Sequence, residues 1–197
     1  MTWLLDLDHS LFHLINGVWT HPALDSLMPI WTDLHKSPYF QFGFVPLVLI
    51  WIYLVARIPG LIFFVLTGLC VALDDGFFGR IIKPLIDRPR PPLANLPFDV
   101  ILRAPQFGGS SMPSVHACNM FAMAAFAGFY FPRLRGILLV FAAITAYSRV
   151  YCGVHFPSDV LAGALGGTLF GTGMAYAIRP SCARIQSTWK KSGPKGI

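Results

Sequence analysis

One short stretch of this sequence combines residue types that can attack and hold a phosphate ester. "SRVYCGVHFPSD", residues 148–159, places Arg149, His155 and Asp159 between two long apolar runs. Asp159 follows His155 by four residues, so its carboxylate can accept a hydrogen bond from one imidazole nitrogen and leave the other as a nucleophile. Ionisable residues at the edge of a membrane span are costly, so this stretch is a candidate functional site.

Two upstream stretches add cations and a second histidine. "KPLIDRPRP" places Lys83 and Arg90 seven residues apart, about two helical turns, so on a helix they would share a face. "SSMPSVHA" places His116 just after Pro113. Proline suits the first turn of a helix, where free backbone N–H groups attract anions. Taken singly, these stretches also fit a snorkelling cation pair and a hydrogen-bonded structural histidine.

The composition indicates which elements must position these residues. The chain has 197 residues, of which 55% are hydrophobic and 12% charged, whereas soluble domains have about 25% charged residues. We therefore predict an integral membrane protein, and a single domain because no linker-like segment separates two halves. The formal charge of +6 suits a membrane surface or an anionic substrate.

The predicted fold is an all-α, polytopic transmembrane helix bundle of five to six spans. Segments that are too short can extend into flanking residues to reach the roughly 20 residues of a span. A weaker segment, residues 24–34, is either a sixth span or an interfacial helix. Apolar residues at helical spacing from Trp3 to Val18 predict an N-terminal amphipathic helix in the membrane interface. The strong apolar segments are residues 40–56, 61–73, 114–131, 136–147 and 160–178.

The single domain 1–197 divides into interfacial N-terminal helices (1–36), a transmembrane catalytic core (37–178) and a basic cytoplasmic tail (179–197). Two predicted spans separate the polar loop 74–113 from the stretch 148–159, so both fall on the same membrane face. Cytoplasmic segments carry an excess of Lys and Arg. With three loop cations assigned to a ligand site, that rule places the short turns and the tail in the cytoplasm and the site outside.

Together the three stretches resemble the motifs of the type 2 phosphatidic acid phosphatase (PAP2) family, which shares its site plan with vanadium haloperoxidases. The second motif of that family usually reads Pro-Ser-Gly-His, and here Val115 replaces the glycine. Valine keeps its backbone N–H for phosphate, but its branched side chain restricts the local backbone. The residues that carry the resemblance are Lys83, Arg90 and Pro91, then Pro113 to His116, then Ser148, Arg149, His155 and Asp159.

This resemblance implies a metal-independent phosphatase that needs no cofactor. His155, oriented by Asp159, would attack phosphorus and form a phosphohistidine. His116 would protonate the leaving oxygen and later activate water. The phosphate-binding residues implied by the resemblance are Lys83, Arg90, Ser114, Val115 and Arg149.

The expected substrate is a lipid phosphate in the bilayer, with undecaprenyl diphosphate as the first choice. Lipid A phosphatase, phosphatidylglycerophosphate phosphatase and lipid phosphotransferase remain open alternatives. An anion transporter is a different class, but the predicted spans 40–56 and 160–178 contain no cation. We expect a multi-pass protein of a bacterial inner membrane with its site facing the periplasm, and no nucleic-acid partner. The sequence leaves the oligomeric state undetermined.

Several polar residues have weaker claims to a function. Arg88 and Arg103 are predicted to be headgroup or surface cations, and the four scattered cysteines to be small apolar residues. His9 and His13 could bind a metal on a helix, but interfacial histidines are usually plain polar residues. His35 has no motif to support it.

Overall fold

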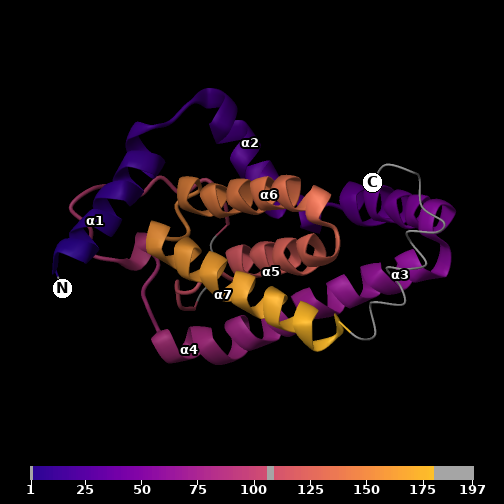
Figure 1. Ribbon diagram of the computed structural model, residues 1–197. Helices are drawn as coiled ribbons and strands as arrows, with labels where there is room; N and C mark the ends of the chain where they lie inside the picture. Colours follow the sequence, from indigo (N-terminus) through magenta and orange to yellow (C-terminus); the bar gives the residue numbers. More distant parts are fainter. Residues whose placement is uncertain (1, 106–108, 180–197) are drawn as a thin grey trace.

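The computed structural model describes residues 2–105 and 109–179, and over that part of the chain it consists of helices, turns and loops without a strand (Figure 1). At its centre lie α5 (Val115–Tyr130), α6 (Pro132–Tyr151) and α7 (Pro157–Ala177). Helix α5 runs between the other two and packs against both, and α3 packs against α5 as well. The predicted all-α bundle is therefore confirmed.

The close approach of α5 and α7 depends on glycine. A Cβ atom added at Gly163 would lie 2.6 Å from the Ser114 carbonyl oxygen, and Cβ atoms at Gly167 and Gly171 would clash with carbonyl oxygens further along α5. Backbones approach this closely only where side chains are absent. The glycine stripe is therefore a packing surface, and it fixes the start of α7 against the start of α5.

Helix α3 (Val45–Phe77), which follows the π-helical turn η3 (Tyr39–Phe44), is a hairpin of two arms. The chain reverses at Arg57, whose φ of 55° and ψ of −148° lie outside the helical region. Gly60 allows the turn, because a Cβ there would come within 2.6 Å of the Ala56 Cβ. The predicted spans 40–56 and 61–73 correspond to the two arms.

The N-terminal part comprises α1 (Thr2–His13), η1 (Leu14–Val18), α2 (Pro22–Asp33) and η2 (Leu34–Lys36). On α1, Trp3, Leu4 and Leu7 are exposed, whereas Asp8 is buried. This arrangement fits the predicted interfacial helix. With 12 residues, α2 is about 18 Å long, too short to cross a hydrocarbon core of about 30 Å. The helix formed by the weak segment is thus shorter than the hydrocarbon core is thick, as suits an interfacial helix.

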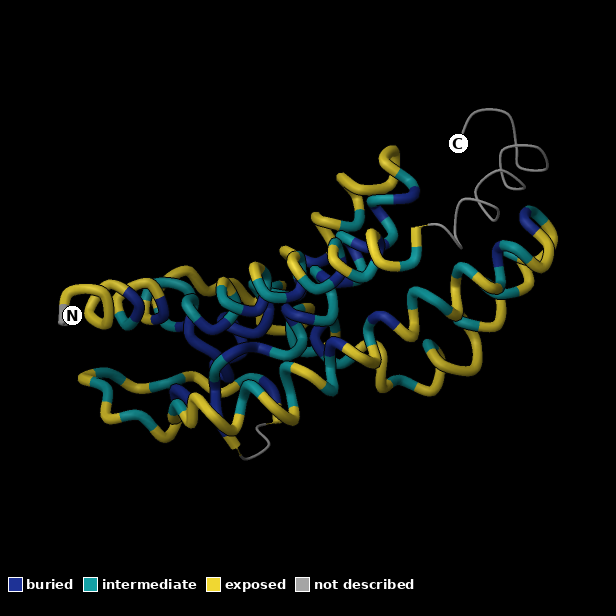
Figure 2. Tube along the Cα trace, turned by 60° about the horizontal axis from the view of Figure 1, so that its bottom comes forward, coloured by how far each residue is buried: buried dark blue, intermediate teal, exposed yellow. Residues whose placement is uncertain are grey.

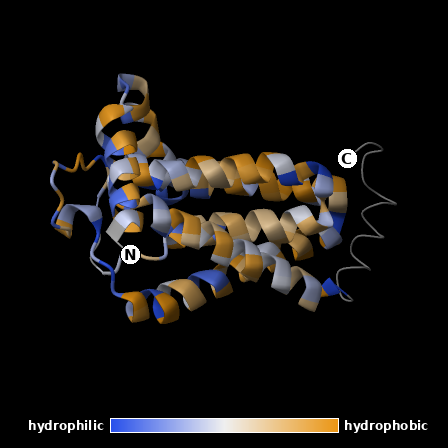
Figure 3. Ribbon diagram, turned by 60° about the vertical axis from the view of Figure 1, so that its left-hand side comes forward, coloured by the Kyte–Doolittle hydropathy of each residue, from blue (hydrophilic) through white to orange (hydrophobic). Residues whose placement is uncertain are grey.

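Within the described residues, three helical segments are long and apolar enough to cross a membrane, namely Tyr39–Leu93, Pro132–Tyr151 and Pro157–Ala177, and α5 is a shorter apolar helix. Apolar side chains cover the outward surfaces, as with Leu161, Leu165 and Leu169 along α7. Buried residues gather where the helices meet (Figure 2), and hydrophobic residues predominate along the helices (Figure 3). This pattern is typical of a protein solvated by lipid.

The connection from α3 to α5 positions the first group of cations. It runs through η4 (Phe78–Ile82), α4 (Lys83–Ile86) and η5 (Pro91–Leu93). Asp87 ends α4 in the left-handed conformation, with φ 44°, and so turns the chain toward Arg88 and Arg90. The polar loops that carry the predicted site therefore meet at one end of the bundle.

Candidate active site

Six of the predicted site residues line one cavity of about 980 Å³, and the other two, Ser114 and Asp159, are buried next to them in the chain or in contact with them. Each comes from the end of an element: α4 starts at Lys83, His116 is in the first turn of α5, and Arg149 is in the last turn of α6. The side chains at the polar end of the cavity are those of Lys83, Arg90, Val115, His116, Arg149 and His155. Residues from three separate stretches of sequence thus face a single space.

His155 lies in the connection between α6 and α7 and is 2% exposed. Its Nδ1 is 3.5 Å from Oδ2 of Asp159, which is longer than a normal hydrogen bond, and the remaining Nε2 is available to a ligand. Burial lowers the pKa of His155 to about 4; Asp159 opposes this shift, and Arg149 and Lys83 add to it. The imidazole is therefore neutral at pH 7, as a nucleophile must be.

Asp159 is buried and held from several sides. Its Oδ2 accepts hydrogen bonds from the Phe156 backbone N–H, at 2.8 Å, and from the Ser111 hydroxyl. Its Oδ1 accepts from Arg88 at 2.7 Å. A carboxylate with this many donors is fixed in position, so it defines where the His155 ring can lie.

The three cations predicted to bind phosphate have only neutral partners among the described residues. Lys83 Nζ is 3.5 Å from the Pro113 carbonyl oxygen, and Arg90 donates to the carbonyl oxygens of Gly109 and Val154 at 3.3 and 3.1 Å. Arg149 donates to the Thr32 hydroxyl at 2.7 Å. Among the described residues, none of the three lies within ion-pair distance of a carboxylate. Buried cations without counter-ions are costly, so this cavity is suited to an anion.

The start of α5 adds further groups to this anion site. Ser114 Oγ and His116 Nε2 are buried and, within the described part of the chain, have no hydrogen-bond partner. The first N–H groups of a helix also lack intrahelical partners, which makes that of Val115 a donor for phosphate. The Val115 side chain points toward Gly79, where an added Cβ would lie 3.6 Å from it. That distance is an ordinary van der Waals contact, so the valine side chain packs beside Gly79 without a clash.

The prediction that Arg88 is a headgroup or surface cation is wrong. Its guanidinium donates to Asp159 and to Asp8, both at 2.7 Å, and to the Ser158 hydroxyl at 2.6 Å. It also lies 4.3 Å from the centre of the Phe156 ring. The available signal was its position inside "KPLIDRPRP", between two residues assigned to the site.

Arg103 is also a structural cation and not a surface one. It donates to Asp25 at 2.6 Å and to the carbonyl oxygens of Asn16 and Tyr151 at 2.9 and 3.0 Å. The hydrogen bond from Tyr151 and the Arg103 charge together lower the pKa of Asp25. This cluster ties the N-terminal helices to the end of α6 and has no contact with the cavity.

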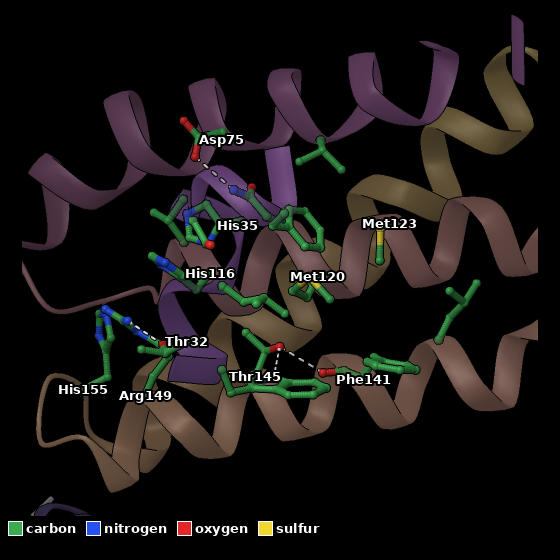
Figure 4. Close-up of a pocket in the computed structure, with 18 of the residues that line it drawn as sticks. Thr32, His35, Asp75, His116, Met120, Met123, Phe141, Thr145, Arg149 and His155 are labelled. Atoms are coloured by element: carbon green, nitrogen blue, oxygen red, sulfur yellow. Dashed lines mark hydrogen bonds between the residues drawn. The ribbon is translucent and has the colours of Figure 1, made fainter. Parts of the chain in front are cut away.

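Among the cavity residues that the N-terminal segment supplies, Thr32 and His35 contact predicted site residues, although sequence reasoning did not select them. Thr32 holds Arg149, and the His35 ring centre lies 5.5 Å from that of His116. Figure 4 shows these side chains on the cavity wall with His155. Burial lowers the pKa of His35, which favours its neutral form beside the cations. No local sequence signal marks either residue.

The deep part of the cavity is apolar. Its walls include Val71, Met120, Met123, Leu138 and Phe141, contributed by α3, α5 and α6. Figure 4 shows Met120, Met123 and Phe141 beyond the polar end formed by His116, Arg149 and His155. A ligand with an anionic head and a hydrocarbon tail matches both ends of this cavity.

A model of the PAP2 superfamily matches residues 61–181, a range that contains all three polar stretches. The chain belongs to this superfamily. It is 30% identical to a lipid A 4'-phosphatase of Bacteroides thetaiotaomicron over 94% of this chain and 83% of the relative. It is 26% identical to undecaprenyl-diphosphatase BcrC of Bacillus subtilis over 84% of this chain and 81% of that relative.

A solved structure supports the assignment to PAP2 at the level of the whole chain. The crystal structure of Aquifex aeolicus LpxE superposes with a TM-score of 0.64 at 29% sequence identity, covering 86% of this chain and 95% of that one. The covered share of this chain is larger than the range 61–181 matched by the PAP2 model, so the similarity in fold extends beyond that range.

Proposed function

We propose that this PAP2 protein is a membrane phosphatase that removes phosphate from a lipid phosphate or diphosphate through a phosphohistidine at His155. The observation that carries the proposal is a set of three cations that have no carboxylate partner in the described part of the chain, in a cavity that His116 and His155 also line. The apolar depth of the same cavity supports a lipid substrate. The names of the two relatives, a lipid A 4'-phosphatase and an undecaprenyl-diphosphatase, are consistent with this class.

In the first step, Lys83, Arg90 and Arg149 hold the phosphoryl oxygens, and guanidinium groups match that planar array of acceptors. Nε2 of His155 attacks phosphorus in line with the lipid oxygen. A P–N bond forms as the P–O bond breaks, and the leaving oxygen takes a proton from His116. The bound phosphate supplies the negative charge that favours a protonated His116.

In the second step, water enters opposite the phosphohistidine bond. His116, now neutral, accepts a proton from this water, whose oxygen attacks phosphorus. The P–N bond breaks, inorganic phosphate leaves, and His155 returns to its neutral form. The cations offset the charge on the equatorial oxygens in both steps, so the proposed cycle requires no metal or cofactor.

Undecaprenyl diphosphate was the first expectation for the lipid, with lipid A and phosphatidylglycerophosphate as alternatives. Phosphate release by purified protein from these three lipids and from phosphatidic acid, with and without EDTA, tests the class and the metal claim. We expect release to persist in excess EDTA and to be inhibited by vanadate, which mimics five-coordinate phosphorus. If EDTA abolishes phosphate release and added magnesium restores it, the metal-free cycle is contradicted. Loss of phosphate from the lipid that requires an acceptor alcohol, and that yields a phosphorylated alcohol in place of inorganic phosphate, would instead indicate a phosphotransferase.

We also propose that the protein lies in a bacterial inner membrane with its site facing outward and its C-terminal tail in the cytoplasm; that tail lies outside the described residues. The test uses a variant with its native cysteines replaced by alanine. An impermeant thiol reagent added to intact spheroplasts should label a cysteine at Asn95 but not one at Gly136. The opposite pattern would invert the orientation.

A further inference from the structure

The wall of the cavity carries a polar pair that the proposed phosphoryl transfer does not use. Asp75 on α3 and Asn119 on α5 both line the cavity, and the Asn119 amide donates to Oδ1 of Asp75 at 3.0 Å. The amide oxygen of Asn119 is buried and has no hydrogen-bond partner among the described residues. Figure 4 shows Asp75 on the same side of the cavity as His35.

The position of this pair places it next to the headgroup of a bound lipid. Asn119 follows His116 by three residues on α5, which is about 5 Å along the helix axis. His116 is the proposed donor to the leaving oxygen. Asp75 and Asn119 therefore lie about one helical turn beyond that oxygen, where the first atoms of the lipid after the phosphate would be.

The free oxygens of the pair can only accept hydrogen bonds. Phosphate and diphosphate oxygens are acceptors and carry negative charge, so a carboxylate repels them, and a prenyl chain offers neither donor nor acceptor. A hydroxyl group or an amide N–H on a sugar or a glycerol unit is a donor that satisfies these oxygens. Leaving a carboxylate and an amide oxygen against hydrocarbon is costly.

We propose that Asp75 and Asn119 form a headgroup subsite that accepts hydrogen bonds from hydroxyl or N–H groups next to the scissile phosphate. The enzyme then prefers a lipid whose phosphate is carried on a sugar or glycerol over a prenyl diphosphate. This inference rests on the proposed lipid phosphatase function and replaces undecaprenyl diphosphate as the first choice of substrate.

The test compares kcat/KM for lipid A, phosphatidylglycerophosphate and undecaprenyl diphosphate in wild-type protein and in two variants, Asn119→Leu and Asp75→Asn. Asn119→Leu removes the amide at similar size, and Asp75→Asn keeps the size but removes the charge. Thr145→Val is the matched control, because the Thr145 hydroxyl lines the same cavity but already bonds Trp31 and the Phe141 carbonyl.

We expect wild type to favour a hydroxyl-bearing lipid over the prenyl diphosphate. The ratio of kcat/KM for the hydroxyl-bearing lipid to kcat/KM for undecaprenyl diphosphate should fall roughly tenfold to a hundredfold in Asn119→Leu, since a hydrogen bond to a buried group is lost. The same ratio should fall less in Asp75→Asn. The ratio should not change in Thr145→Val. Whichever of lipid A and phosphatidylglycerophosphate shows the fall identifies the sugar or the glycerol as the donor.

An unchanged ratio in both variants, or an equal loss for all three lipids, would overturn the subsite while leaving the phosphatase intact. Preference of wild type for the prenyl diphosphate would overturn it too. Failure of wild-type protein to release phosphate from any of the lipids would instead contradict the proposed function itself.

Discussion

The core helices and the N-terminal helices contribute to the site in different ways. The range matched by the PAP2 model, residues 61–181, supplies the two histidines, the phosphate-binding cations and Asp159. The first 60 residues lie outside it and supply Asp8 and Thr32, which hold Arg88 and Arg149 by hydrogen bonds of 2.7 Å. The groups that would touch phosphate thus come from the motifs, and part of what orients them comes from outside.

The two arginines of "DRPRP" show the same difference between a residue that faces the cavity and a residue that orients the site. Arg90 faces the cavity, and its hydrogen bonds to the described residues all go to carbonyl oxygens, so its charge is available to a ligand. Arg88, two residues earlier, forms ion pairs with Asp8 and Asp159. The two residues are of the same type and lie in the same short stretch, so the distribution of carboxylates in space is what leaves Arg90 free for the proposed role in phosphate binding and gives Arg88 a supporting role.

The largest effect on this comparison is expected within the core. His116→Ala should lower kcat for a lipid phosphate by about 10²- to 10⁴-fold, because the leaving oxygen loses its proton donor. Release of the aryl alcohol in the first turnover of an aryl phosphate, whose leaving group needs no proton, should fall far less, and the phosphoenzyme should accumulate because His116 also activates the water. Pre-steady-state measurement of alcohol release from both substrates checks this, and equal losses in that first step would show that His116 is not the general acid.

The next effect links the N-terminal part to the core. Arg88→Gln frees Asp159 from one side, and we expect kcat to fall about tenfold to a hundredfold, since a small displacement of the nucleophile is costly. KM should change little. Asp8→Asn removes one of the two ion pairs of Arg88 but keeps its contact with Asp159, so kcat should fall less.

The control for Arg88 is Arg103, an equally paired loop cation without contact to the cavity. Arg103→Gln should lower the temperature of unfolding without a specific loss of kcat in the folded fraction. If the two arginine variants behave alike, the contact between Arg88 and Asp159 stabilises the fold and does not position the nucleophile.

A smaller effect is expected at Thr32. Thr32→Val removes the hydroxyl that fixes Arg149, and KM should rise by roughly tenfold, the range for a hydrogen bond to a charged group. Thr67→Val removes a hydroxyl that bonds only the Phe63 carbonyl within α3, so it should leave KM unchanged. If the two variants have the same KM, the contact from Thr32 to Arg149 does not contribute to substrate binding.

The smallest effect concerns pH. The folded pKa of His155, about 4, lies below its ordinary value of 6.5, so its neutral, nucleophilic form persists down to about pH 4 and is lost below it. The enzyme's acid limb in kcat/KM should therefore lie near pH 4. Asp159→Asn removes a group that raises this pKa, so the limb should move to lower pH. If the acid limb lies at the same pH in Asp159→Asn as in wild type, it reports the ionisation of the substrate and not that of His155.

The sequence predicted the helical bundle and the meeting of the three stretches for simple physical reasons. Apolar segments at membrane length are local signals, and two spans between two polar loops bring both loops to one face. It could not predict the roles of Arg88 and Thr32, because their partners are distant. Arg88 bonds residues 80 positions earlier and 71 later, and Thr32 lies 117 positions from Arg149. Nothing in hydropathy or spacing encodes such pairings.

The covalent intermediate at His155 is the central claim, and trapping it is the most direct test. Wild-type protein mixed with a radioactive phosphoryl donor and rapidly quenched should carry an acid-labile, base-stable label, as a phosphohistidine does. His155→Ala should carry none and should not turn over, while still binding the lipid. A label that survives this substitution, or normal turnover without His155, would contradict the account.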